Sequence, residues 1–187
     1  MLSGRRLDLI DPSPLDVEIE DIAHGLARVA RWNGQTKGDW AYSVAEHSVL
    51  VERIFAELKP RPTREHRLMA LLHDAPEYVI GDMISPFKAA LGLDYRAFED
   101  RLEAAVHLRF GLPVKTPEMV KARIKRADRA AAWLEAVQLA GFDAAEARRH
   151  FVRPRFPGWE AIRLDPLPPG AACEAFLARF TALTAQG

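Results

Sequence analysis

Apolar residues recur every three or four positions along most of this chain, and this spacing limits its possible folds more than any other feature. Ile19, Ile22, Leu26 and Val29, for example, fall on one side of a helix. No segment shows the convincing apolar–polar alternation of a strand. The pattern predicts an all-α fold. Further helices are expected at about 43–58, 63–80, 94–110, 116–139 and 171–184.

Length and proline content indicate one domain with an irregular C-terminal part. The 187 residues are enough for one substantial core and few for two. Five prolines fall between residues 150 and 170. We therefore expect a single domain over 1–187. Its core should span about 18–140, and a Pro-rich C-terminal appendage, about 145–187, should end in a short helix.

Several helix ends carry local signals. Ser43 and Glu46 have the spacing of a capping box at the start of a helix. Thr116 fits an N-cap, with Pro117 at the first helical position. Pro76 falls inside the predicted helix 63–80, where it lacks an amide proton and is expected to cause a kink.

Composition excludes some classes of function. The 26 basic and 26 acidic residues cancel, so there is no overall positive field that would gather nucleic acid. A small anionic substrate remains possible, because local charge decides its binding. Cys173 is the single cysteine, so no intrachain disulfide can form, which suits a reducing compartment. The start does not read as a signal peptide and no segment is long enough to span a membrane, so we expect a cytoplasmic protein.

Ionisable residues interrupt three otherwise apolar helical faces. His47 shares the face of leucines and isoleucine in the helix at 43–58, and Asp128 lies among inward alanines and isoleucine. His73 and Asp74 are adjacent in a leucine-rich segment. A buried acid beside a buried histidine is costly unless another charge compensates it, and a divalent cation would do so. Two imidazoles with two carboxylates suit Mn²⁺, Co²⁺, Fe²⁺, Ni²⁺ or Zn²⁺ better than Ca²⁺.

Each of these positions also has an ordinary structural interpretation. A lone inward histidine such as His47 is commonly a core residue whose hydrogen bonds are satisfied. Asp128 has Arg and Lys neighbours that could pair with it, and His73-Asp74 could be a chance pair on a helix surface. The spacing alone leaves metal binding and these structural roles open.

The order of these residues, H…HD…D, resembles the motif of the HD-domain phosphohydrolases. The surrounding segments are similar to those of the YfbR-like 5′-deoxynucleotidases, and also to phage dATP triphosphohydrolases of the HD type. They are AEHS (45–48), LLHDAPE (71–77), IGD (80–82) with SPFK (85–88), and RADRAA (126–131). The resemblance covers about residues 18–140. It implies an all-α domain in which His47, His73, Asp74 and Asp128 hold one catalytic divalent ion.

The same resemblance implies roles for five more residues. Glu77 would orient or deprotonate the attacking water, and Asp82 would give a proton to the leaving oxygen. Arg31 and Lys88 would hold the substrate phosphate, and Trp32 would pack against the sugar or base. For each residue the alternative is an ordinary one: a solvated acid or lysine, a turn aspartate, or a surface arginine beside a core tryptophan.

The expected activity is hydrolysis of deoxynucleoside 5′-monophosphates to deoxynucleosides and phosphate. One alternative is a dNTP (dATP) triphosphohydrolase that releases tripolyphosphate, and another is a non-catalytic HD-type signalling module. A (p)ppGpp hydrolase is disfavoured, because Tyr78 follows Glu77 where those enzymes have aspartate. Loop 33–42 departs from the deoxynucleotidase pattern, so the reaction type is better supported than the substrate. The expected partner is a small nucleotide, not nucleic acid or a membrane, and a homodimer follows from the resemblance only.

Overall fold

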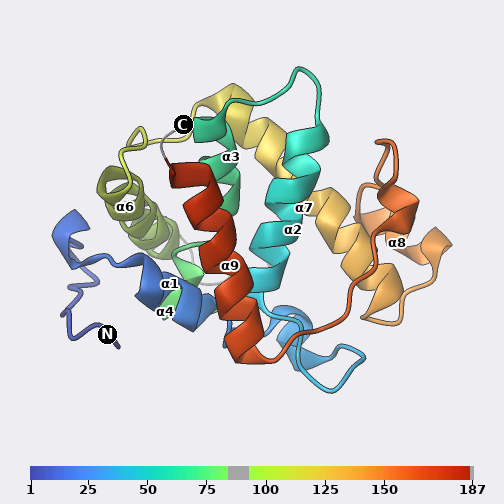
Figure 1. The fold of residues 1–187 in the computed structure, drawn as a ribbon, viewed down its shortest axis with the longest axis horizontal. Coiled ribbons are helices and arrows are strands. Elements are labelled where there is room, and N and C mark those ends of the chain that lie inside the picture. The colour runs from blue at the N-terminus through green and yellow to red at the C-terminus, as the bar shows by residue number, and fades with distance from the viewer. Residues whose placement is uncertain (84–92, 186–187) are drawn as a thin grey trace.

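Helices make up the regular structure throughout the part of the chain that the computed structural model describes, residues 1–83 and 93–185 (Figure 1). The predicted all-α fold is confirmed, with no strand among these residues. No helix in the described ranges is long and apolar enough to cross a bilayer. The helices are α1 (Ile19–Leu26), α2 (Val44–Glu57), α3 (Arg64–Leu71), α4 (Glu77–Ile80), α6 (Leu93–Arg109), α7 (Glu118–Gln138), α8 (Ala144–His150) and α9 (Pro169–Thr184), with short 3-10 turns at Pro14–Asp16, Arg31–Gly34 and Trp159–Ala161.

Helix α2 lies at the centre of the fold, in contact with α1, α3, α7 and α9. Its start has the predicted capping box: the Ser43 hydroxyl accepts from the Glu46 amide, and the Glu46 carboxylate accepts from the Ser43 amide at 2.9 Å. These bonds satisfy amide groups that the first helical turn leaves without partners. The same box therefore fixes the end of α2 that carries His47.

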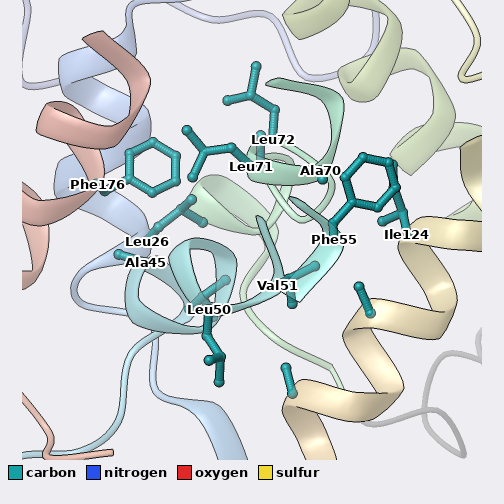
Figure 2. Close-up of a cluster of buried hydrophobic side chains, with 14 of the residues drawn as sticks. Leu26, Ala45, Leu50, Val51, Phe55, Ala70, Leu71, Leu72, Ile124 and Phe176 are labelled. Carbon is teal, nitrogen blue, oxygen red and sulfur yellow. The ribbon is translucent and has the colours of Figure 1, made fainter. Parts of the chain in front are cut away.

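The hydrophobic core joins the C-terminal helix to the rest of the bundle. Figure 2 shows Phe55 of α2 near Ile124 of α7, and Phe176 of α9 on the side of Leu26 and Leu71. Phe55 and Phe176 are fully buried, and burial of a large apolar side chain contributes about 1.5–3 kcal/mol. Because α9 also packs against α1, α2 and α3, the C-terminal segment is part of the core and not the appendage that the prolines predict.

The segment predicted as one kinked helix, 63–80, is two helices separated by a turn. Helix α3 ends at Leu71, residues 72–76 form turns, and α4 begins at Glu77. Pro76 has no amide proton to donate to the Leu72 carbonyl, which accepts instead from the Ala75 amide at 2.9 Å. The prediction of a continuous helix is wrong here, because the proline stops it instead of bending it.

Helix α4 is held close to α1 by a glycine. A Cβ atom added at Gly25 would lie 2.8 Å from the Tyr78 carbonyl oxygen and 2.9 Å from the Tyr78 Cβ. Only a residue without a side chain fits this approach. Since Tyr78 follows Glu77 directly, the Gly25 contact also fixes the position of Glu77.

Two further details differ from the predicted helix ends. Thr116 does not cap α7, because its hydroxyl donates to Glu103 at 3.2 Å, and Pro117 is the N-cap in place of the first helical residue. Helix α8 is not among the predicted helices. Its N-cap, Asp143, accepts from the amides of Ala145 and Glu146.

Candidate metal centre

The structure brings together three metal-ligating side chains from separate parts of the sequence. His47 lies on α2, His73 in the turn between α3 and α4, and Asp128 on α7. Their ligating atoms all lie within 4.8 Å of one another, so these three residues form a group that could hold a metal ion. Asp74 adjoins the group, with Oδ2 3.5 Å from His47 Nε2 and 3.2 Å from His73 Nε2.

Hydrogen bonds behind the two imidazoles set which nitrogen faces the cluster. His47 Nδ1 lies 2.5 Å from Glu135 Oε1, and His73 Nδ1 lies 3.0 Å from the Ala70 carbonyl oxygen. A carbonyl oxygen and an ionised carboxylate only accept, so Nδ1 carries the proton in both rings. A neutral imidazole then presents the Nε2 lone pair to the cluster, which is the form that binds a metal.

Both Nε2 atoms are buried and make no hydrogen bond within the described ranges. Buried polar nitrogens that make no hydrogen bond are rare and costly. A cation between His47, His73 and the two carboxylates would satisfy them, so the side chains fit a metal ion. Exposure rises from 0% for His47 through 13% for His73 and 23% for Asp74 to 36% for Asp128. Solvent therefore reaches the cluster from the Asp128 side.

The electrostatics of the cluster favour added positive charge. Burial and the Arg31 charge lower the pKa of His47, but Glu135 and Asp128 outweigh them and raise it to about 10. Burial raises the pKa of Asp74, yet the charges of His73 and His47 hold it well below its usual range. A site that attracts a proton so strongly also attracts a divalent ion, which would displace the proton from His47.

Glu135 is a central residue that the sequence analysis missed. Its side chain is fully buried, with Oε1 at His47 Nδ1 and Oε2 accepting from Trp32 Nε1 at 2.9 Å. Burial raises its pKa, but the charges of His47 and Arg31 outweigh burial and lower it to about 2. The sequence does carry a signal for Glu135, because it follows Asp128 by seven residues on α7 and so lies on the same apolar face, two turns later.

Arg31 links two of the acidic residues. One terminal nitrogen lies 2.9 Å from Asp82 Oδ2 and the other 3.4 Å from Glu135 Oε2. Burial lowers the pKa of Arg31, but Glu135 and Asp82 outweigh it and raise the pKa above its usual range. A guanidinium has five N–H groups, and Arg31 Nε is buried with no partner in the described ranges. Arg31 therefore keeps N–H groups that an anion could use.

Trp32 has an unusual backbone and a fixed ring. Its φ of 55° is in the left-handed region, which bulky residues rarely adopt. The indole donates to Glu135 and packs at 5.8 Å from Phe142 and 5.6 Å from Phe151 between ring centroids. These contacts outweigh the backbone strain, which costs about 1–3 kcal/mol. The observed contacts thus place Trp32 beside Glu135.

The remaining predicted residues lie after the HD pair. Glu77 is the first residue of α4 and is 3% exposed, so it is not a solvated acid. Its amide donates to the Asp74 carbonyl at 3.0 Å, which puts it one turn beyond the cluster. Asp82 forms an ion pair with Arg31 at 2.9 Å. Lys88 and the predicted SPFK segment lie outside the described residues.

Comparison with known proteins identifies two relatives. An uncharacterized protein of Rhodobacter capsulatus is 62% identical over 181 residues, which cover 96% of this chain and 91% of that protein. Uncharacterized protein YfdR of Escherichia coli is 32% identical over 171 residues, which cover 90% of this chain and 85% of YfdR. This chain belongs to the YfdR family. No family model matches it, and the names of these YfdR-family relatives assign no activity.

Proposed function

We propose that this chain is a metal-dependent phosphohydrolase of the HD-domain superfamily, acting on deoxynucleoside 5′-monophosphates. The observation that carries the proposal is the pair of buried Nε2 atoms of His47 and His73, which make no hydrogen bond in the described ranges and face the carboxylates of Asp74 and Asp128. The ligand order along the chain matches the H…HD…D motif. The hydrogen bonds to Glu135 and Ala70 hold both rings with Nδ1 turned away and Nε2 turned toward the carboxylates, the orientation that a metal ligand needs.

In the proposed mechanism the metal ion and the side chains named above have separate roles. A bound Mn²⁺, Co²⁺, Fe²⁺, Ni²⁺ or Zn²⁺ ion would polarise a phosphoryl oxygen and lower the pKa of water. Glu77, one turn beyond Asp74, would position the attacking water and accept its proton. Arg31 would offset phosphate charge with the N–H groups that its two carboxylate partners leave over, and Lys88 would assist. Asp82 would return a proton to the leaving oxygen.

The preference for a deoxy sugar rests on Trp32. In the proposed binding mode the indole limits the room for a 2′-hydroxyl and gives it no hydrogen-bond acceptor. Contacts with Glu135, Phe142 and Phe151 hold the ring, so it would resist displacement by one added oxygen.

A pair of variants tests the metal assignment. Asp74→Ala removes a ligand carboxylate, so metal content after loading with Mn²⁺ or Co²⁺ and phosphate release from a dNMP should fall together. Glu77→Ala should keep the metal and lose about 10²-fold or more in kcat. Elemental analysis and phosphate assays measure both quantities. Wild-type metal content in Asp74→Ala would remove Asp74 from the site, and a Glu77→Ala rate within a few-fold of wild type would remove Glu77 from its role.

Product analysis tests the substrate class. Metal-loaded protein is incubated with NMPs, dNMPs and dNTPs, and the phosphorus products are identified by ³¹P NMR. Orthophosphate from dNMPs supports the proposal. Tripolyphosphate from dNTPs would assign the triphosphohydrolase activity instead. Protein that binds no metal and releases no product would point to a non-catalytic module.

A further inference from the structure

Two neighbouring hollows beside α7 and α8 are lined in part by arginines and share lining residues. The larger has a volume of about 490 Å³ and is lined in part by Arg148, Arg153 and Arg155. The smaller has a volume of about 120 Å³ and shares Arg153 and Arg155 with it, adding Arg126 from α7. We call the two hollows together the arginine cleft.

The charges of the arginine cleft are uncompensated. Where the structure describes the chain, no acidic residue lines either hollow, and none of Arg126, Arg148, Arg153 and Arg155 forms an ion pair. The whole chain carries no net charge, so this concentration of positive charge is local. Guanidinium groups gathered in a concave site attract an anion, because their forks match phosphate oxygens.

The cleft also has a fixed apolar side. Phe151, Val152, Pro154 and Trp159 line the larger hollow, and the Arg153 guanidinium lies 5.0 Å from the Trp159 ring centroid. The chain that forms this side is anchored to α7 at Arg129. The Arg129 side chain donates to the His150 carbonyl, and its own carbonyl accepts from the Val152 amide, both at 3.3 Å. The two hydrogen bonds to Arg129 therefore fix the chain that lines the cleft, which has a charged part and an apolar, partly aromatic part.

We propose that the arginine cleft binds a nucleoside triphosphate, with the phosphate chain on the guanidiniums and the base against the apolar side. Four arginines exceed what a single phosphate group needs, and a triphosphate carries several negative charges on one ligand. The larger hollow has the volume of a small-molecule site, whereas a nucleic-acid surface would need a longer basic stripe. The cleft shares no lining residue with the metal cluster, so the inference does not depend on the proposed function.

The test measures binding to metal-free, EDTA-treated protein by isothermal titration calorimetry. The ligands are dATP, inorganic tripolyphosphate and a short single-stranded oligonucleotide. Arg148→Gln with Arg155→Gln removes two cleft charges at exposed positions. Arg61→Gln with Arg101→Gln removes the same charge from exposed positions elsewhere and is the matched control.

We expect dATP to bind, with affinity reduced about tenfold or more in the cleft double variant. The control double variant should stay within about twofold of wild type. Arg153→Gln should weaken dATP binding by a similar factor. Because this variant also loses the Trp159 contact, circular dichroism checks that it still folds. Absence of dATP binding, or equal losses in both double variants, would overturn the proposal. Tripolyphosphate binding as tightly as dATP would overturn the nucleoside assignment, and tighter oligonucleotide binding would assign the cleft to nucleic acid.

Discussion

Glu135 offers the sharpest test at the scale of single residues, because its carboxylate accepts from His47, Trp32 and Arg31. Glu135→Gln keeps the shape but replaces one acceptor oxygen with a donor group that faces other donors. His47 would lose the partner that fixes its tautomer, so affinity for Co²⁺ or Mn²⁺ should fall about 10–100-fold. Equilibrium dialysis measures it, with exposed Glu118→Gln on the same helix as control. Unchanged affinity in Glu135→Gln would show that His47 needs no such support.

Trp32 combines two roles that substitution can separate. Trp32→Ala removes the ring, so the ratio of kcat/KM for a dNMP to that for its matching NMP should fall. Trp32→Phe keeps an aromatic ring but removes the N–H that Glu135 accepts, so it should keep more of the sugar preference and bind metal more weakly. Steady-state kinetics and metal titration measure the two effects. A stable Trp32→Ala protein with the wild-type ratio would exclude Trp32 from sugar selection.

At the scale of elements, one buried acid ties three helices together. Glu52 of α2 is fully buried and accepts from Arg67 of α3 at 2.6 Å and from Arg179 of α9. Glu52→Ala should lower the free energy of unfolding by about 1.5–3 kcal/mol, since the two arginines are partly exposed and can be hydrated. Urea unfolding measures this loss, and exposed Glu57→Ala on the same helix is the control. Equal free energies of unfolding for Glu52→Ala and Glu57→Ala would mean that the Glu52 ion pairs contribute nothing to the docking of α9.

At the scale of the whole molecule, metal binding should appear as stability. An ion that binds the folded chain alone, at a free concentration 100 times its Kd, adds about 2.7 kcal/mol to the free energy of unfolding. For a chain of this size that corresponds to a rise in Tm of about 5–10 °C. Differential scanning fluorimetry of EDTA-treated protein, with and without Mn²⁺ or Co²⁺, measures the shift. The Asp128→Asn variant should show little rise in Tm when the metal is added. A rise equal to that of the wild type would mean that the ion binds elsewhere.

Local features of the sequence determined the helical fold and marked His47 and Asp128 as ionisable residues on apolar helical faces. The capping box at Ser43 and the apolar faces that carry His47 and Asp128 depend on residues within a few turns, so spacing alone reveals them. The break at Pro76 was only half predicted. A missing amide proton is visible in the sequence, but whether a helix bends or stops depends on what packs around it.

Tertiary structure alone decided the rest of the site. His47 and Glu135 are 88 residues apart in sequence, and they meet only because α2 packs against α7. A buried glutamate on an apolar face signals that it needs a partner, but the sequence does not say which one. The same holds for α9, whose Phe176 joins the core although the proline-rich segment before it predicts an appendage. Helix formation follows from neighbouring residues, whereas the meeting of side chains follows from the packing of distant helices.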